Sequence, residues 1–239
     1  MTGYGLYLES GPQRRKTMVH VLNLLGCVAS GPTTEQALLA TPDAIRAYLR
    51  FLRRHGDAVD PDEPITTSVV EHVTEGSWLG QGSPYLVFGP DLEPLSDAEV
   101  DVLLSRFAWL RGELAGWADS HTAEELTVAP ADGGRSSWDV LRHVLSATGG
   151  YLSAALGSAP GFSRVAGAVE RGELDVAAGL RHTITMVEER VRATTPEERA
   201  AVRVLPAGPR TLRKALRRAL EHDWEHLVEL SRRPGGPAL

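Results

Sequence analysis

The sequence has a single cysteine, Cys27, so the chain can form no internal disulfide bond and no cysteine-rich metal site. Nothing near Cys27 in the sequence would activate its thiol, and we expect it to pack within a strand. If the protein carries out thiol chemistry, the thiol is therefore expected to arrive on a small molecule.

The chain also lacks any apolar run long enough to span a bilayer, and its first residues do not show the charged and then apolar pattern of a signal peptide. We therefore expect a cytoplasmic protein with no membrane partner. Lysine occurs at only two positions, Lys16 and Lys214, and the net charge is -6. This charge argues against a general nucleic-acid-binding protein.

With 239 residues, of which 42% are hydrophobic, the chain is long enough to bury the core of one large domain or two small ones. Residues 1–75 combine predicted strands and helices, whereas residues 95–239 predict helices alone. Residues 76–94 are rich in glycine, proline and serine and are predicted to link the two domains. The sequence therefore predicts an α+β protein in which a small sheet-and-helix domain precedes a helical domain.

Strand and helix patterns alternate in the first region. We expect strands at Tyr4–Glu9, within Lys16–Ser30 and at Pro64–Thr74, where β-branched and apolar residues are frequent. The capping pattern at Thr33–Gln36 predicts a short helix. A second cap at Thr41–Asp43, with proline at the first helical position, predicts that another helix begins there.

This region resembles a known small domain. The stretch LGCVASGPTTEQAL from Leu25 to Leu38, followed by the helix from Ala44 to Leu52, resembles the HicB-like domain. The resemblance implies a strand-strand-strand-helix-strand fold over the first 75 residues, known from the antitoxins of toxin–antitoxin pairs. No helix-turn-helix or basic ribbon follows it, so we expect a surface that binds a protein partner instead of a repressor.

Four long amphipathic helices are predicted after residue 94. They run from the Ser96 cap to about Trp117, from Ser136 to about Leu156, from about Glu173 to Ala193, and from Thr211 to Arg232. Four such helices after a break predict an antiparallel four-helix bundle.

Three histidines of this region are candidate metal ligands. His222 and His226 lie four residues apart on the last helix, which places both imidazoles on one face, one turn apart. His143 lies in the second helix. Small residues flank the histidines on both helices and predict unfilled volume beside them. These residues are Ala147, Gly150 and Ala154 in the second helix, and Ala215 and Ala219 in the last.

A purely structural role of the same histidines is the alternative interpretation. The chain has eight histidines, so a pair at this spacing also arises by composition alone, and helical histidines are often polar neighbours of the core. The other five are interpreted as structural or surface residues: His20, His55, His72, His121 and His182.

Two segments resemble the DinB superfamily. They are EELTVAPADGGRSSWDVLRHVLSATGGYL, from Glu124 to Leu152, and LEHDWEHL, from Leu220 to Leu227. Members are four-helix bundles that hold zinc or nickel with one histidine of the second helix and an HxxxH pair of the fourth. The resemblance, over residues 95–233, implies that His143, His222 and His226 are the ligands. It also implies a thiol-dependent transferase or isomerase that uses mycothiol or bacillithiol.

Four further residues are candidates for supporting roles. Asp139 either orients His143 or caps its helix. Asp223 is expected to have a buried hydrogen-bond partner, and its own role is either to support a metal ligand from behind or purely structural. Arg142 and Arg218 either bind a substrate carboxylate or are solvated surface charges. No residue is assigned to the chemical step itself.

The sequence therefore favours a metal-dependent thiol S-transferase or isomerase acting on a small electrophile. A metal hydroxide, and hence a hydrolase, is a second use of the same ligands. The alternative is a non-enzymatic interaction or regulatory protein, in which the metal stabilises the bundle and the HicB-like region binds a partner. A homodimer is compatible with either hypothesis.

Overall fold

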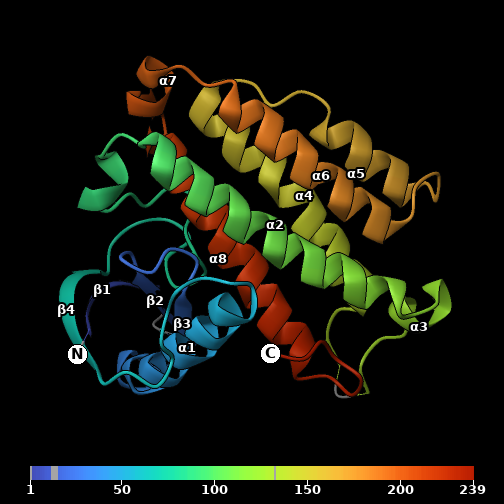
Figure 1. Ribbon diagram of the computed structural model, residues 1–239, viewed down its shortest axis with the longest axis horizontal. Coiled ribbons are helices and arrows are strands. Elements are labelled where there is room, and N and C mark those ends of the chain that lie inside the picture. The colour runs from blue at the N-terminus through green and yellow to red at the C-terminus, as the bar shows by residue number, and fades with distance from the viewer. Residues whose placement is uncertain (1, 12–15, 132) are drawn as a thin grey trace. The chain divides into compact units, whose positions relative to one another are not determined.

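The computed structural model describes residues 2–11, 16–131 and 133–239 (Figure 1). The chain divides into two compact units. The first consists of Met1–Glu93, Val202–Arg210 and Leu239, and the second of Pro94–Ala201 and Thr211–Ala238. The first unit combines strands and a helix, and long helices dominate the second. The predicted mixture of an N-terminal sheet and a C-terminal helical region is confirmed.

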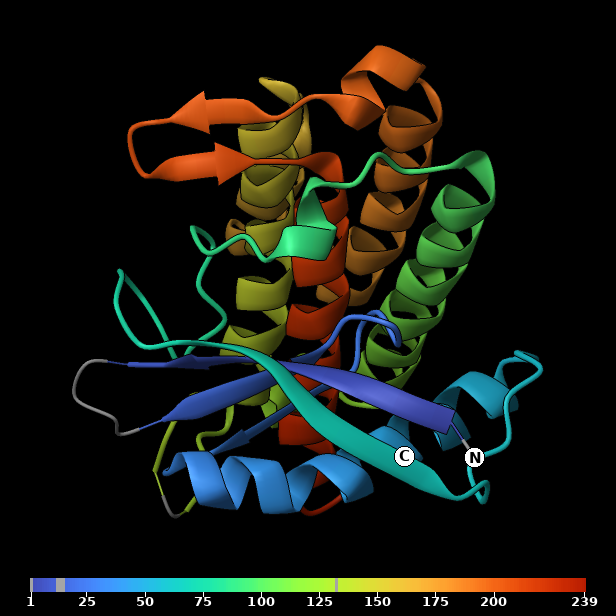
Figure 2. The ribbon, with the colours of Figure 1, turned by 90° about the vertical axis from the view of Figure 1, so that its left-hand side faces the viewer.

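A four-stranded sheet forms the centre of the first unit. Its strands are β1 (Thr2–Ser10), β2 (Thr17–Val21), β3 (Val28–Gly31) and β4 (Ile65–Val73), in the order β3-β2-β1-β4. β1 is antiparallel to β2 and parallel to β4, and helix α1 (Thr34–Arg54) lies along one face of the sheet (Figure 2). The elements therefore follow one another as strand, strand, strand, helix and strand.

The strand-like stretch Lys16–Ser30 is two strands and not one. β2 and β3 pair antiparallel, with His20 opposite Val28, and a tight turn joins them. Gly26 in this turn has φ of 102°, a conformation that glycine adopts without steric cost. The apolar pattern alone did not predict this reversal, because it continues through the turn.

The prediction of two separate helices in the region of α1 was wrong. Thr33 is the N-cap, as expected, but the helix continues through Pro42 to Arg54. An interior proline lacks the amide hydrogen that would bond the preceding turn. Ala37, Thr41 and Ile45 are nevertheless buried at successive four-residue steps, so both halves present one continuous apolar stripe. Burial of this stripe offsets the cost of the proline.

The chain returns to the first unit late in the sequence. β5 (Arg203–Leu205) and β6 (Gly208–Arg210) form a short hairpin that was not predicted. The segment expected to be a linker also lies in this unit and contains the short 3-10 helix η1 (Gly89–Leu92). Phe88, which precedes η1, packs its ring 5.3 Å from that of Tyr7 and 5.4 Å from that of His20. The segment therefore covers part of the sheet.

The second unit contains the four predicted long helices. They are α2 (Asp97–Asp119), α4 (Ser137–Leu156), α6 (Val176–Arg192) and α8 (Leu212–Ser231). Their caps are the expected serines and threonine at Ser96, Ser136 and Thr211, with Asp175 before α6. Three short helices were not predicted: α3 (Ala123–Thr127), α5 (Phe162–Glu170) and α7 (Pro196–Ala200). α2 packs against α6 and α8, and α4 packs against α8 (Figure 1).

A buried arginine connects all four long helices. Arg111 of α2 is fully buried and forms a two-point ion pair with Asp223 of α8. It also donates to the Val144 carbonyl oxygen (2.9 Å) and the Thr148 hydroxyl (2.5 Å) of α4, and to the Thr183 hydroxyl of α6 (3.0 Å). Burial raises the pKa of the Asp223 carboxyl, and the Arg111 guanidinium opposes that rise.

None of the helices in the described part of the chain combines the length and apolarity that crossing a bilayer requires.

Replacing Arg111 by methionine is expected to lower the free energy of unfolding by about 3–5 kcal/mol, because the Asp223 carboxylate stays buried without its partner. Urea denaturation at neutral pH measures this loss. The double replacement Arg111→Met, Asp223→Leu removes both charges and is expected to recover most of it.

The matched control is Arg192→Met, which breaks half-exposed ion pairs with Asp101 and Glu188 and should cost about 1 kcal/mol or less. A loss for Arg111→Met no larger than that of this control would contradict the structural role of the buried pair.

Candidate metal centre

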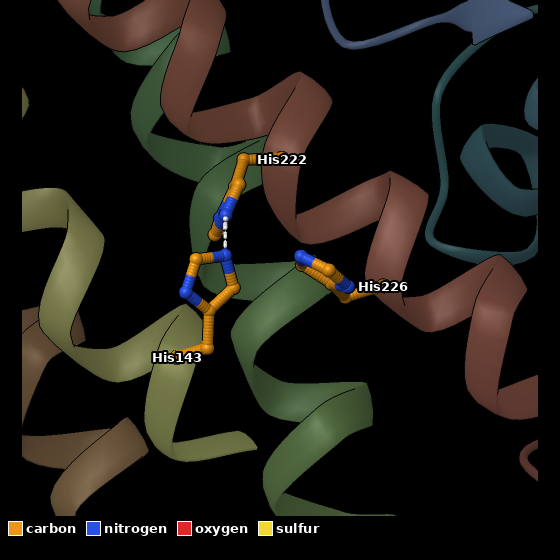
Figure 3. A group of neighbouring side chains, drawn as sticks. All are labelled: His143, His222 and His226. Carbon is orange, nitrogen blue, oxygen red and sulfur yellow. Dashed lines mark hydrogen bonds between the residues drawn. The ribbon is translucent and has the colours of Figure 1, made fainter. Parts of the chain in front are cut away.

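Helices α4 and α8 bring the three candidate histidines together. His143 projects from α4, and His222 and His226 project from successive turns of α8. Figure 3 shows the three rings turned toward a common point. One nitrogen of each ring can be chosen so that all three nitrogens lie within 4.8 Å of one another.

The separations of the rings agree with the requirements of a shared ion. Nitrogens bound to one zinc ion at about 2.0–2.1 Å each lie no more than about 4.2 Å apart. The Nε2 atoms of His143 and His222 are 2.9 Å apart, and the centroids of the three rings lie between 4.6 and 5.1 Å from one another. A small rotation of side chains is therefore enough to bring all three nitrogens within bonding distance of one cation.

The surroundings keep two of the imidazoles neutral, which is the protonation state of a metal ligand. Partial burial, together with the charges of His226, Arg135 and Arg218, lowers the pKa of His143 to about 4. Burial, with Arg218 and the neighbouring histidines, holds the pKa of His222 well below its usual range. Both rings therefore offer a free lone pair at neutral pH.

His222 also carries a buried nitrogen that has no hydrogen-bond partner in the described part of the chain. This atom, Nδ1, lies 3.8 Å from the Asp223 carboxylate. A proton on Nδ1 is stabilised by the carboxylate charge and leaves the Nε2 lone pair directed at His143. The two facing Nε2 atoms are thus placed as two ligand atoms of one shared ion.

Glu229 fixes the orientation of the third ring. Its carboxylate accepts a hydrogen bond from Nδ1 of His226 at 2.8 Å, which leaves Nε2 of that ring as the available donor atom. Arg135 and Arg233 each bind the same carboxylate at 3.0 Å. Burial raises the pKa of Glu229, but the hydrogen bond from His226 and the two arginines outweigh it and lower the pKa to about 2. A carboxylate behind a ligating histidine is a frequent arrangement in metal sites.

The group is open on one side. His143 is exposed, the His226 side chain is 11% exposed, and His222 is buried. Within residues 2–11, 16–131 and 133–239, no cysteine or carboxylate joins the three histidines as a further ligand. A metal held here would keep a coordination position for a water molecule or a substrate.

The two aspartates of the region have other partners. Asp139 belongs to the start of α4: its carboxylate accepts a hydrogen bond from the Ser136 hydroxyl at 2.7 Å, and its amide donates to that hydroxyl. Asp223 has the buried partner that was expected, and the partner is Arg111. Of the two roles considered for Asp139, the structure favours the helix cap.

The candidate arginines lie in different surroundings. Arg142 pairs with Glu170 at 2.8 Å and lies over the Trp138 ring. Arg218, in contrast, is buried, and it pairs with Glu225 at 2.9 Å. The charge of Arg218 acts on both His143 and His222, so it borders the histidine group.

The small residues beside the histidines are more exposed on α4 than on α8. Gly150 is exposed, and a methyl group added there would meet nothing within 4 Å. Ala147 and Ala154 are half-buried. On α8, Ala215 and Ala219 are buried, and the predicted unfilled volume beside the histidines stays a prediction. The open surface next to the site follows the α4 strip.

The family comparison agrees with this geometry. A model of the DinB superfamily matches residues 106–230, which is more than half of the chain. The chain belongs to the DinB superfamily. Members of the DinB superfamily are generally metal-binding, and the three histidines of this chain could form such a site.

The match to the DinB superfamily covers α4 and α8 and therefore all three histidines. It does not include the N-terminal unit, and no family match supports a HicB-like domain there. No curated protein and no solved structure matches the chain.

Sequence reasoning missed three residues of this DinB-superfamily site. Arg111 follows Phe107 by four residues on the apolar stripe of α2, and a charge on such a stripe signals a buried partner. Glu229 follows His226 by three residues, which is the spacing of neighbours on a helix. The third residue is Tyr151, whose half-buried ring meets that of His222 edge-on at 6.0 Å.

Purified protein is expected to bind one zinc or nickel ion per chain, as measured by elemental analysis and calorimetric titration. Replacing His143, His222 or His226 by alanine should lower the affinity at least about 100-fold, since even outer partners of a metal contribute 10- to 100-fold. His182→Ala, which removes an exposed histidine of α6, is the control. Unchanged stoichiometric binding by the triple variant would exclude this site.

Replacing Glu229 by glutamine is expected to weaken metal binding by about 10- to 100-fold, because the neutral amide no longer favours the proton on Nδ1 of His226. Glu170→Gln is matched to it, since Glu170 also pairs with an arginine but lies in a surface ion pair. Equal affinities for the two variants would show that Glu229 has no role in orienting the ligand.

Proposed function

We propose that the protein is a divalent-metal-dependent enzyme that transfers a thiol to a small electrophile or uses a thiol to assist an isomerisation. The observation that carries this proposal is the convergence of His143, His222 and His226 with one ring exposed. Neutral nitrogen ligands that leave a position open are typical of catalytic metal sites, whereas structural sites are closed by a fourth protein ligand.

The metal ligands, Glu229 and Arg218 have different roles in the proposed reaction. A zinc or nickel ion held by the three imidazoles would supply Lewis-acid chemistry and lower the pKa of a thiol in the open position. Glu229 orients His226. Arg218 is the better placed of the two proposed anion-binding arginines, because its charge acts directly on His222 and on Tyr151. In the transfer, the sulfur bonds to an electrophilic carbon, the leaving group departs with the bonding electrons, and the thiol proton passes to solvent.

The thiol itself is proposed to be a low-molecular-weight compound such as mycothiol or bacillithiol. Cys27, the one cysteine of the chain, is buried at the start of β3 in the first unit. It is therefore closed to a reacting electrophile, and the nucleophile has to come from outside the chain.

The finer architecture belongs to the same proposal. The packing of α2, α4, α6 and α8 supports a four-helix bundle of DinB type. The order β1-β2-β3-α1-β4 supports a HicB-like module in the first unit. We propose a cytoplasmic location for the whole protein.

The first unit favours a second candidate function, that of a partner-binding protein with a structural metal. β4 is an edge strand of the sheet and carries exposed Val69 and Val70. Edge strands of this kind can pair with a strand of another chain. In this alternative the histidine site stabilises the second unit and has no substrate.

Conjugation assays distinguish the two functions. Zinc- or nickel-loaded protein is incubated with 1-chloro-2,4-dinitrobenzene and, in turn, mycothiol, bacillithiol, glutathione or cysteine, and the thioether is quantified by mass spectrometry. We expect metal-dependent product with at least one thiol, and a loss of rate of at least about 100-fold in His222→Ala but not in His182→Ala. A metal that raises the melting temperature, without product from any thiol, would support the structural role instead.

A further inference from the structure

A second candidate site lies in the first unit, independent of the histidines. It is a cleft of about 570 Å³ between the loop that follows β4 and the turn of the β5–β6 hairpin. Glu75, Trp78, Leu79 and Tyr85 line the cleft on the loop side, and Pro206 lines it on the hairpin side. This volume lies within the range of pockets that bind small molecules.

The loop that carries the cleft is held in place by a buried carboxylate. Glu9 of β1 is buried and accepts hydrogen bonds from the amides of Gly82 (2.5 Å) and Ser83 (3.0 Å). The Ser83 hydroxyl donates to the Ser77 carbonyl oxygen at 2.9 Å and accepts from the Tyr85 amide at 3.2 Å. These contacts hold the loop side of the cleft without a ligand, so binding requires little ordering of this part of the backbone.

The loop also depends on a glycine at one close contact. Gly80 has φ of 78°, and a Cβ atom there would lie 2.1 Å from the carbonyl oxygen of Lys16. Only glycine permits this approach of the loop to the start of β2. The position of the cleft wall is therefore fixed by the backbone itself.

Trp78 is held at the cleft in an unfavourable state. Its φ of 63° is the one left-handed value at a non-glycine position within the described residues, and the residue is 64% exposed. This conformation is strained for a bulky residue, and exposure of the side chain forgoes the stabilisation that its burial would give. Such an arrangement persists where the surrounding loop imposes it, and it leaves an exposed aromatic side chain in the lining of the cleft.

The charged residues around the cleft favour a ligand of positive charge. Glu75 is the one charged residue among the described residues that line it, and its carboxylate is exposed. Tyr85 already receives a cation on one side, because the Arg210 guanidinium lies 5.0 Å from its ring centroid. The lining of the cleft thus combines an exposed tryptophan with one carboxylate.

We propose that this cleft binds a small organic cation of the alkylammonium class. The cation lies against the Trp78 ring and near the Glu75 carboxylate, while its alkyl groups contact Leu79 and Pro206. A cation is attracted both to an indole face and to a carboxylate. This attraction explains why Trp78 is exposed at the cleft and why the proposed ligand is positively charged. The proposal is independent of the metal and of the thiol reaction.

Calorimetric titration of the full chain with choline, and with its uncharged isostere 3,3-dimethylbutan-1-ol, tests the proposal. We expect choline to bind to wild-type protein and the isostere to bind at least about 5-fold more weakly. Trp78→Ala and Glu75→Gln should each weaken choline binding by about 5- to 30-fold. Trp78→Phe should lose less than Trp78→Ala, because it retains a ring face.

Glu189→Gln, which removes an exposed carboxylate of α6 outside the cleft, should leave choline binding unchanged. Circular dichroism of each variant verifies folding. Because Trp78 and Glu75 are exposed, their replacement is expected to leave the fold intact. The proposal is overturned if choline does not bind at millimolar concentration, if the isostere binds equally well, or if Trp78→Ala retains wild-type affinity.

Discussion

The buried ion pair between Arg111 and Asp223 is the interaction on which the metal centre depends. The guanidinium reaches α8 through Asp223 and α4 through the Val144 carbonyl oxygen. Val144 directly follows His143, and Asp223 directly follows His222. The pair therefore fixes the backbone next to one ligand on each helix, so that the two imidazoles face each other at 2.9 Å. A buried ion pair is suited to fixing the helices in one arrangement. Any other packing of the helices would leave one of the two charges in the core without its partner, which is strongly unfavourable.

The site combines a rigid interior with an accessible edge. His222 is buried and held by its neighbours, His226 is oriented by Glu229, and His143 lies exposed beside the open strip of α4 that contains Gly150. Burial and nearby arginines disfavour protonation of His143 and His222, whereas Asp223 lies behind His222 and Glu229 behind His226. This arrangement is suited to a divalent cation with a free position, and it agrees with membership of the DinB superfamily.

The first unit shows how packing overrides local signals. Pro42 is a strong helix-stop signal, yet α1 continues through it because its buried residues form one stripe against the sheet. Trp78 is bulky and apolar, yet it is exposed in a left-handed conformation because Glu9 and Gly80 fix the loop around it. In both cases contacts distant in sequence decide the local conformation.

The sequence by itself determined the four long helices, their caps at Ser96, Ser136 and Thr211, and the three histidines, because periodicity, caps and i,i+4 spacing are local properties. Only the tertiary structure decided which charges lie inside. Arg217 and Glu221 of α8 carry charges, yet both are buried as an ion pair, because contacts with distant segments decide how much of a helix surface is covered. The partners Arg111 and Glu229, the hairpin at Arg203–Arg210 and the cleft beside Trp78 arise likewise from contacts between distant segments, which no local pattern records.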